Sequence, residues 1–260
     1  MPIDIFKHNQ DAWDRQARQQ GPWSQPVGPQ ITAAARRGDW QVHLTPSPLP
    51  PAWLGDVSGQ RILCLASGGG QQAPVLAAAG ALVTVLDASP EQLARDREVA
   101  ERDGLQLETR LGDMRDLSAF VDGAFDCIFH PISNLYVPDI RPIWRECFRT
   151  LRNGGRLLSS FYNPVVFIGD RDPALAEQGL IRPRYRLPYS DLRDLSAQAL
   201  NDRQQRGEAL VFGHSLAEQI GGQLEAGFVL RGFLEDEQPN PRFVVDRFVP
   251  TFLATWAEKP

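Results

Sequence analysis

Short apolar runs alternate with amphipathic segments from Arg61 onward. Nearly continuous apolar strands separated by helices are typical of a parallel sheet that is covered on both faces. The pattern therefore predicts a doubly wound α/β core. Two later runs, "FVLRGFLED" and "PTFLATWAE", have no helix between them and predict a closing antiparallel pair. The five runs assigned to the core strands are "RILCLA", "ALVTVLD", "QLETRLGD", "FDCIFH" and "GRLLSSFY".

Two serine-led sequences mark helix starts. Ser89 is followed by Pro90 and, three positions after the serine, by Gln92, as expected for an N-cap, a first-turn proline and a capping-box partner. The sequence "SLAE" at 215–218 repeats the arrangement. The helix that it opens is expected to end near Gly227.

The chain outside the core strands divides into an arm and an insertion. Residues 1–55 hold three tryptophans among polar residues and end in "LTPSPLPPAW", whose prolines predict an extended linker. Prolines and charges interrupt every apolar run between about 163 and 210. We expect an N-terminal arm over 1–55 that packs on the core as a lid. One domain should follow over 56–260, with an insertion at about 163–210 that covers one end of the sheet.

Charge and composition exclude several classes of partner. The net charge is -5, with no concentrated basic stripe, so nucleic acid is not expected. Cys64, Cys127 and Cys147 form no C-x-x-C pair, which favours reduced packing residues in a cytoplasmic protein and no metal site. No leader pattern or apolar run of about 20 residues is present, so no membrane association is expected. The oligomeric state stays open.

The stretch from Ala66 to Gln72 joins the first core strand to the helix that follows. Its small residues allow a ligand to approach the main chain, and the N–H groups that open the next helix can receive an acceptor group. The spacing Gly68-x-Gly70-x-x-Ala73, followed by Asp87, also matches a dinucleotide fingerprint. A tight turn without a ligand is a further reading, so the loop alone does not choose between ligands.

Three further features distinguish these readings. Asp87 ends the run "VTVLD", Asp113 and Met114 lie in "LGDMRDL", and the segment from Phe125 ends in a glycine turn and another strand, "LRNGGRLLSSF". Over about 61–162 these features resemble the class I S-adenosylmethionine-dependent methyltransferases. The string "LCLASGGGQQ" resembles a bacterial small-molecule group within them, similar to methyltransferase type 11.

The resemblance implies a fold and a cofactor. The fold would be a Rossmann-like sheet of seven strands, mostly parallel with an antiparallel C-terminal strand, and the cofactor would be S-adenosylmethionine. Asp87 would hold both ribose hydroxyls, Asp113 would accept from the adenine amino group, and the Met114 N–H would donate to the ring. The cofactor site implied in this way comprises Ala66, Ser67, Gly68, Gly69, Gly70, Gln71, Gln72, Asp87, Ala88, Ser89, Gln92, Gly112, Asp113, Met114, His130, Pro131 and Ser133.

The glycine loop departs from the family pattern at two positions. The family has an acid in place of Cys64 and a glycine in place of Ala66. Loss of the acid removes a contact to the methionine moiety, so we expect Ser67, Gln71 or Gln72 to supply polar contacts instead.

The acceptor is expected to lie beside "HPISN", residues 130–134. Methyl transfer requires mainly alignment in a desolvated pocket, and a base is needed only when the acceptor must lose a proton. His130 is the candidate base, although it is also suited to a hydrogen bond with the cofactor or main chain. The acceptor residues are expected to be Trp13, Trp23, Trp40, Asn134, Tyr136, Tyr162 and Arg184.

Simpler roles remain open for the arm and the insertion. The arm tryptophans would equally pin the arm to the core. "RPRYRLPY" at 182–189 either adds cationic groups that favour an anionic or oxygenated acceptor, or is a solvated surface loop.

The leading hypothesis is therefore methyl transfer to an oxygen, nitrogen or sulfur atom of an unidentified small molecule. One alternative is an NAD(P)-dependent oxidoreductase, but the chain lacks a Tyr-x-x-x-Lys pair and has only two lysines, Lys7 and Lys259. The other alternative is a non-catalytic protein that binds the nucleoside, which the sequence does not exclude.

Overall fold

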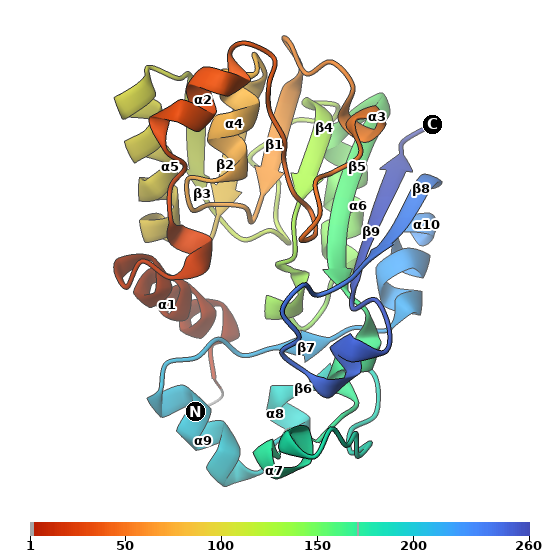
Figure 1. Ribbon diagram of the computed structural model, residues 1–260. Coiled ribbons are helices and arrows are strands. Elements are labelled where there is room, and N and C mark those ends of the chain that lie inside the picture. Colours follow the sequence, from red (N-terminus) through yellow and green to blue (C-terminus); the bar gives the residue numbers. More distant parts are fainter. Residues whose placement is uncertain (1–2, 171) are drawn as a thin grey trace.

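A seven-stranded sheet forms the centre of the molecule, in the order β3-β2-β1-β4-β5-β9-β8 (Figure 1). The computed structural model describes residues 3–170 and 172–260. The strands are β1 (Arg61–Leu65), β2 (Leu82–Asp87), β3 (Leu107–Leu111), β4 (Phe125–His130), β5 (Leu151–Tyr162), β8 (Val229–Asp236) and β9 (Phe252–Glu258). All five predicted core strands and the closing pair are present.

The strand directions confirm the predicted fold class. β1 pairs in parallel with β2 and β4, β2 with β3, and β4 with β5. β9 runs antiparallel to both β5 and β8. From β1, the strand order runs through β2 to β3 on one side and begins with β4 on the other. A crevice for a ligand is expected where these two directions diverge, at the carboxyl ends of the strands.

The sheet is covered on both faces, because alternate residues of each strand point in opposite directions. Ile62 and Cys64 pack in one core with residues of α4 (Gln72–Ala78) and α5 (Pro90–Asp103). Leu63 and Leu65 pack in a second core with residues of α6 (Arg141–Thr150). All three cysteines are buried thiols in these cores.

The two predicted helix starts form, each with a local difference. Ser89 Oγ accepts from the Gln92 N–H at 3.1 Å, but the Ser89 N–H donates to Asp87 rather than to the Gln92 side chain. The second capping box is reciprocal. Its helix passes through a π-helical turn (η4, Ala217–Gly221) into α10 (Gly222–Glu225) before Gly227, which has a φ of +107°.

The arm contains helices and lies against the core. α1 (Ile5–Arg18) packs on α5, and η1 (Pro22–Ser24) and α2 (Pro29–Ala35) follow it. The predicted extended linker is wrong at its end, where α3 (Pro51–Leu54) forms. A proline at the first helical position is already set for a helix, and burial of Trp53 stabilises the turn.

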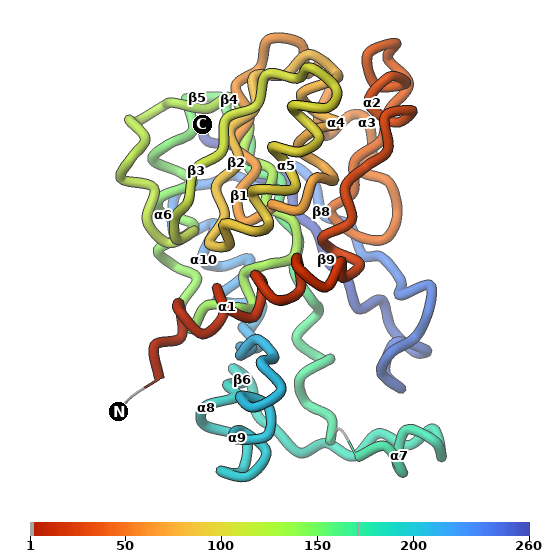
Figure 2. The backbone as a smooth tube through the Cα atoms, turned by 90° about the vertical axis from the view of Figure 1, so that its left-hand side faces the viewer, coloured from red at the N-terminus to blue at the C-terminus, as the bar shows by residue number. Residues whose placement is uncertain are grey.

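The insertion lies beyond the carboxyl ends of the core strands, and α1 runs between it and the sheet (Figure 2). Its short strands pair antiparallel. Its elements are η3 (Pro164–Phe167), α7 (Pro173–Glu177), β6 (Tyr189–Ser190), α8 (Asp191–Asp194), α9 (Ala197–Gln205) and β7 (Phe212–Gly213). Among the described residues, no helix combines the length and apolar character needed to span a bilayer.

Candidate functional site

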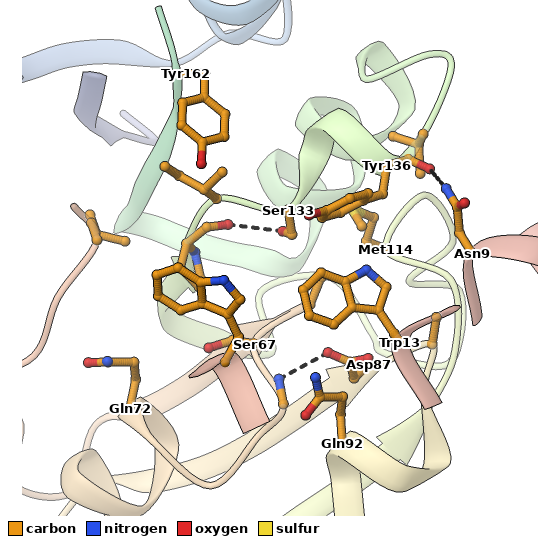
Figure 3. Close-up of a pocket in the computed structure, with 18 of the residues that line it drawn as sticks. Asn9, Trp13, Ser67, Gln72, Asp87, Gln92, Met114, Ser133, Tyr136 and Tyr162 are labelled. Carbon is orange, nitrogen blue, oxygen red and sulfur yellow. Dashed lines mark hydrogen bonds between the residues drawn. The ribbon is translucent and has the colours of Figure 1, made fainter. Parts of the chain in front are cut away.

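A cavity of about 580 Å³ opens at the carboxyl ends of the strands (Figure 3). Its lining follows the order of the sheet from β3 to β9. Phe252 belongs to this edge because the antiparallel β9 starts where β5 ends, opposite Tyr162. The core residues that line it include Asp113–Arg115 after β3, Asp87 at the end of β2 and Ala88 after it, Ala66–Gly68 after β1, Pro131–Ser133 after β4, Tyr162 at the end of β5 and Phe252.

The arm and the loop between β8 and β9 complete the cavity wall. Trp13 on α1 packs edge-on against Tyr136, with ring centroids 5.2 Å apart. In Figure 3 the Trp13 ring lies between Tyr136 and Asp87. The arm contributes Ile5, Phe6, Asn9, Gln10, Trp13, Trp23 and 43–46, and the β8–β9 loop contributes 238–240 and Arg242.

The conformation of the glycine loop allows it to make close contact with the arm. Ala66 has a φ of +48°, a left-handed conformation that explains why the family has glycine there. A side chain at Gly69 would collide with the Trp23 carbonyl oxygen of the arm. Gln71 Nε2 donates to the arm carbonyl of Pro22 at 2.9 Å. The loop therefore contacts the arm and also lines the cavity.

Asp96 holds the glycine loop from behind the cavity wall, and the sequence analysis did not select it. Its buried carboxyl group accepts from the Gly69 N–H at 3.0 Å and the Gly70 N–H at 3.1 Å. Burial raises the pKa of Asp96 to about 8. Its position on the buried stripe of α5, three residues after Leu93 and three before Val99, was the available signal. These two loop N–H groups, expected to receive a ligand, bind Asp96 instead.

Asp87 lies at the cavity wall with its carboxylate held in a fixed orientation. Oδ2 accepts from the Gly68 N–H at 3.0 Å and Oδ1 from the Ser89 N–H at 2.9 Å. Burial raises its pKa. Each oxygen keeps a further lone pair, and the buried Gln92 Oε1 has no partner among the described residues. This set of acceptors fits two adjacent hydroxyls, as in a ribose.

Asp113 and Met114 line the same end of the cavity. The Asp113 carboxylate is bound by Arg115, with Nη2 donating to Oδ2 at 2.6 Å and Nε to Oδ1 at 3.1 Å. Arg115, which also lines the cavity, was not among the expected residues. Asp113 therefore lines the cavity as an ion pair with Arg115.

The structure does not place His130 at the acceptor position. The ring is fully buried and packs edge-on against Trp144, and its Nδ1–H donates to the Leu65 carbonyl oxygen at 2.9 Å. Burial lowers its pKa to about 4. His130 shares the α6 face of β4 with Ile128, and within the described chain it does not line the cavity. Its role as a base is not supported by this geometry.

Three of the expected acceptor residues also lie elsewhere. Asn134 is buried, and its Nδ2 donates to Gln219 Oε1 at 2.8 Å. Trp40 packs against the core cluster, so it pins the arm. Arg184 pairs with Asp170 in the insertion at 3.3 Å. Trp13, Trp23, Tyr136 and Tyr162 do line the cavity.

The expected cofactor residues divide in the same way. Those with surface in the cavity are Ala66, Ser67, Gly68, Gln71, Gln72, Asp87, Ala88, Gln92, Asp113, Met114, Pro131 and Ser133. The remaining ones, which lie behind this wall in the described chain, are Gly69, Gly70, Ser89, Gly112 and His130.

His43 and Arg242 line the cavity although sequence reasoning did not select them. The His43 N–H donates to Gln72 Oε1 at 2.8 Å, and its Nδ1–H donates to the Pro46 carbonyl oxygen at 3.3 Å. Arg242 Nη2 donates to Tyr162 Oη at 2.8 Å. Both residues are distant in sequence from the core motifs, which is why motif spacing gave no signal for them.

Comparison with known proteins identifies close and distant relatives. A family described as "Methyltransferase domain" matches residues 63–159. The chain is 45% identical over 256 residues to "Uncharacterized methyltransferase YbaJ" of Bacillus subtilis, covering 98% of each chain. It is 34% identical over 114 residues to a ubiquinone biosynthesis O-methyltransferase of Xanthomonas oryzae, covering 43% of this chain and 48% of that protein.

Solved structures share the fold. An S-adenosylmethionine-dependent methyltransferase from Mesorhizobium loti superposes with a TM-score of 0.61 at 20% identity, over 80% of this chain and 94% of that one. Geranyl diphosphate C-methyltransferase from Streptomyces coelicolor, solved with S-adenosylhomocysteine, gives 0.55 at 17% identity, over 80% and 76%. Neither the oxidoreductase nor the non-catalytic alternative finds support. The chain belongs to the class I methyltransferases and is an enzyme that uses S-adenosylmethionine.

Proposed function

We propose that this enzyme transfers the methyl group to a small molecule enclosed in the cavity described above. The observation that carries the proposal is the order of the lining along the sheet. Asp87, Gln92 and Met114 lie toward β2 and β3 and suit a nucleoside. Tyr162 and Phe252 lie toward β5 and β9. The acceptor is therefore assigned to the β5 side, with Ala66–Gly68 between the two halves.

The arm supports a small acceptor because it closes over the nucleoside half. Gln10 Nε2 donates to the Ala88 carbonyl oxygen at 2.7 Å, and Ser89 Oγ donates to Asp14 Oδ1 at 2.5 Å. A cavity of about 580 Å³ lies in the range of small-molecule sites, about 300–1,000 Å³. The enclosed volume has to hold the cofactor and the acceptor together, which disfavours a polymer as substrate.

The chemistry asked of the protein is alignment and exclusion of water. S-adenosylmethionine supplies an electrophilic methyl group on its sulfonium. Asp87 and Gln92 would fix the nucleoside, and Trp13 and Tyr136 would exclude water from it. Where the acceptor has a proton to lose, His43 is the cavity imidazole suited to take it. Its Nδ1–H bond to the Pro46 carbonyl oxygen leaves Nε2 as a proton acceptor.

Methyl-labelled S-adenosylmethionine, incubated with a bacterial metabolite extract, tests the proposal. We expect label in the small-molecule fraction after separation by size. Label confined to protein or nucleic acid would contradict it. His43→Asn should lower kcat by at least about 100-fold for an acceptor that loses a proton, with unchanged affinity for S-adenosylhomocysteine. An unchanged kcat would show that transfer proceeds without His43.

A further inference from the structure

The acceptor half of the cavity contains a cation with no carboxylate partner. We propose that Arg242 and Tyr162 bind the carboxylate of a small acceptor with an aromatic body. This inference rests on the proposed function, because it names the class of molecule that occupies the β5 side of the same cavity.

The charges of the lining are unevenly distributed. Asp87, Asp113, Arg115 and Arg242 are the charged aspartate and arginine residues of the described lining. Arg115 is paired with Asp113. Both aspartates lie in the nucleoside half, whereas Arg242 makes no ion pair with any carboxylate in the described chain. An anionic group would therefore be repelled from the β2–β3 end and attracted to the β5–β9 end.

Neutral groups hold the guanidinium of Arg242 in place. Nη2 donates to Tyr162 Oη at 2.8 Å. With the Gln238 amide oxygen turned toward the guanidinium, it accepts from Nη2 at 3.1 Å and Nε at 3.0 Å. These contacts leave the charge of Arg242 uncompensated. They also leave the Nη1 hydrogens free to donate, since no described residue accepts from them.

Tyr162 adds a donor beside the cation. Its oxygen accepts from Arg242, so its own O–H is free to donate to a ligand. The hydroxyl points into the cavity in Figure 3. Two adjacent donor groups, one of them charged, match the two oxygens of a carboxylate.

The loop that carries Arg242 is fixed by a buried acid. Asp246, in η5 (Val244–Arg247), accepts from the N–H groups of Arg242 and Phe243, each at 2.8 Å. Asn163 Nδ2 donates to the Pro250 carbonyl oxygen at 3.2 Å, which ties the end of this loop to the end of β5. These hydrogen bonds fix the loop in the conformation that places Arg242 beside Tyr162.

The surrounding wall suits a flat apolar body. The rings of Tyr162 and Phe252 lie with their centroids 5.2 Å apart, and Ile132 and Trp23 also line the cavity. Arg182 and Arg184 of the insertion do not serve this purpose, because both pair with Asp170, and Arg186 is not in the described lining of this cavity. The anion site is therefore assigned to the β8–β9 loop.

Titration of the S-adenosylhomocysteine complex with phenylacetate and with phenylacetamide tests the assignment. Tryptophan fluorescence is a suitable signal, because Trp13 and Trp23 line the cavity. We expect saturable binding of phenylacetate, weakened at least about tenfold by Arg242→Gln and by replacing the acid with the amide. Arg242→Lys should retain part of the affinity. Arg247→Gln, an exposed arginine of η5 outside the described lining, is the matched control and should bind as wild type.

Three results would overturn the proposal. These are equal affinity for acid and amide, unchanged affinity in Arg242→Gln, and no saturable binding of phenylacetate, benzoate or cinnamate at millimolar concentration. Binding of S-adenosylhomocysteine is measured on every variant. If the wild-type protein does not bind S-adenosylhomocysteine, the proposed function is contradicted. If it does bind, and Arg242→Gln does not weaken binding of the acid, only the anion site is contradicted.

Discussion

At the residue scale, two opposing effects set the pKa of Asp96. Hydrogen bonds from the loop favour its charged form, and burial favours its neutral form. The Gly69 and Gly70 N–H groups and the charge of Arg97 lower its pKa, whereas burial and the Asp87 carboxylate raise it. Burial is the largest effect, so the pKa rises to about 8. The folded protein therefore retains a proton here that the unfolded chain releases near its ordinary value of about 3.9.

This difference predicts how stability depends on pH. Because the folded state binds more protons than the unfolded state between about pH 4 and about pH 8, the contribution of Asp96 to the free energy of unfolding falls as pH rises through that window. The slope is at most about 1.4 kcal/mol per pH unit. Urea denaturation across the window would measure it.

Asp96→Asn should remove this slope. It should also lower stability by about 1–3 kcal/mol, because its amide nitrogen would face an N–H donor of the loop. Glu98→Gln, an exposed acid on the same helix, should keep the wild-type slope. A wild-type pH profile in Asp96→Asn would mean that Asp96 is charged throughout.

The sequence predicted which residues lie near the site better than it predicted where each side chain points. Asp87, Asp113 and Ser133 were selected because they follow strand ends, and all three line the cavity. His130 was selected on the same ground and points away. β4 is buried on both faces, so its apolar run did not show which face its last residue occupies.

At the element scale, α1 joins the core to the insertion through Asn9. Its Nδ2 donates to the Tyr136 carbonyl oxygen at 2.7 Å and to the Leu210 carbonyl oxygen at 3.0 Å, and its Oδ1 accepts from the Leu210 N–H at 2.8 Å. Asn9 is buried, so these groups would lack partners without it.

Asn9→Ala should therefore loosen the arm. We expect a loss of about 1–3 kcal/mol in unfolding free energy, faster tryptic cleavage after Arg15 and Arg18, and weaker binding of S-adenosylhomocysteine. Gln19→Ala, at the exposed end of the same helix, is the control. Wild-type cleavage and affinity in Asn9→Ala would show that this tether does not hold the arm closed.

The arm was expected to pack on the core as a lid. Its contacts lie beside the nucleoside half of the cavity and on the core of the sheet. Gln10 and Asp14 bind the segment that follows β2, and Val42 and Leu44 belong to the core that covers the sheet. These contacts join residues far apart in sequence, so composition predicted that the arm packs but not where.

At the scale of the whole molecule, alternating strands and helices were sufficient to predict the sheet. β1, β2 and β4 have nearly continuous apolar patterns, whereas the edge strand β3 carries three polar residues between two leucines. Two of the helices have recognisable starts. The insertion was predicted only as a region, because its hydrophobic cluster of Tyr189, Phe167 and Val211 forms from residues without a regular period. Arg242 was missed because its loop reaches the cavity only when β8 and β9 pair.

The most direct measurement is a calorimetric titration of S-adenosylhomocysteine into wild-type protein and Asp87→Ala. We predict one site per chain and a loss of about 1–3 kcal/mol in binding free energy in the variant, from lost hydrogen bonds to a charged group. Glu108→Gln, an exposed acid on β3, should bind as wild type. Equal affinity of Asp87→Ala and wild type would contradict the placement of the nucleoside at the carboxyl end of β2.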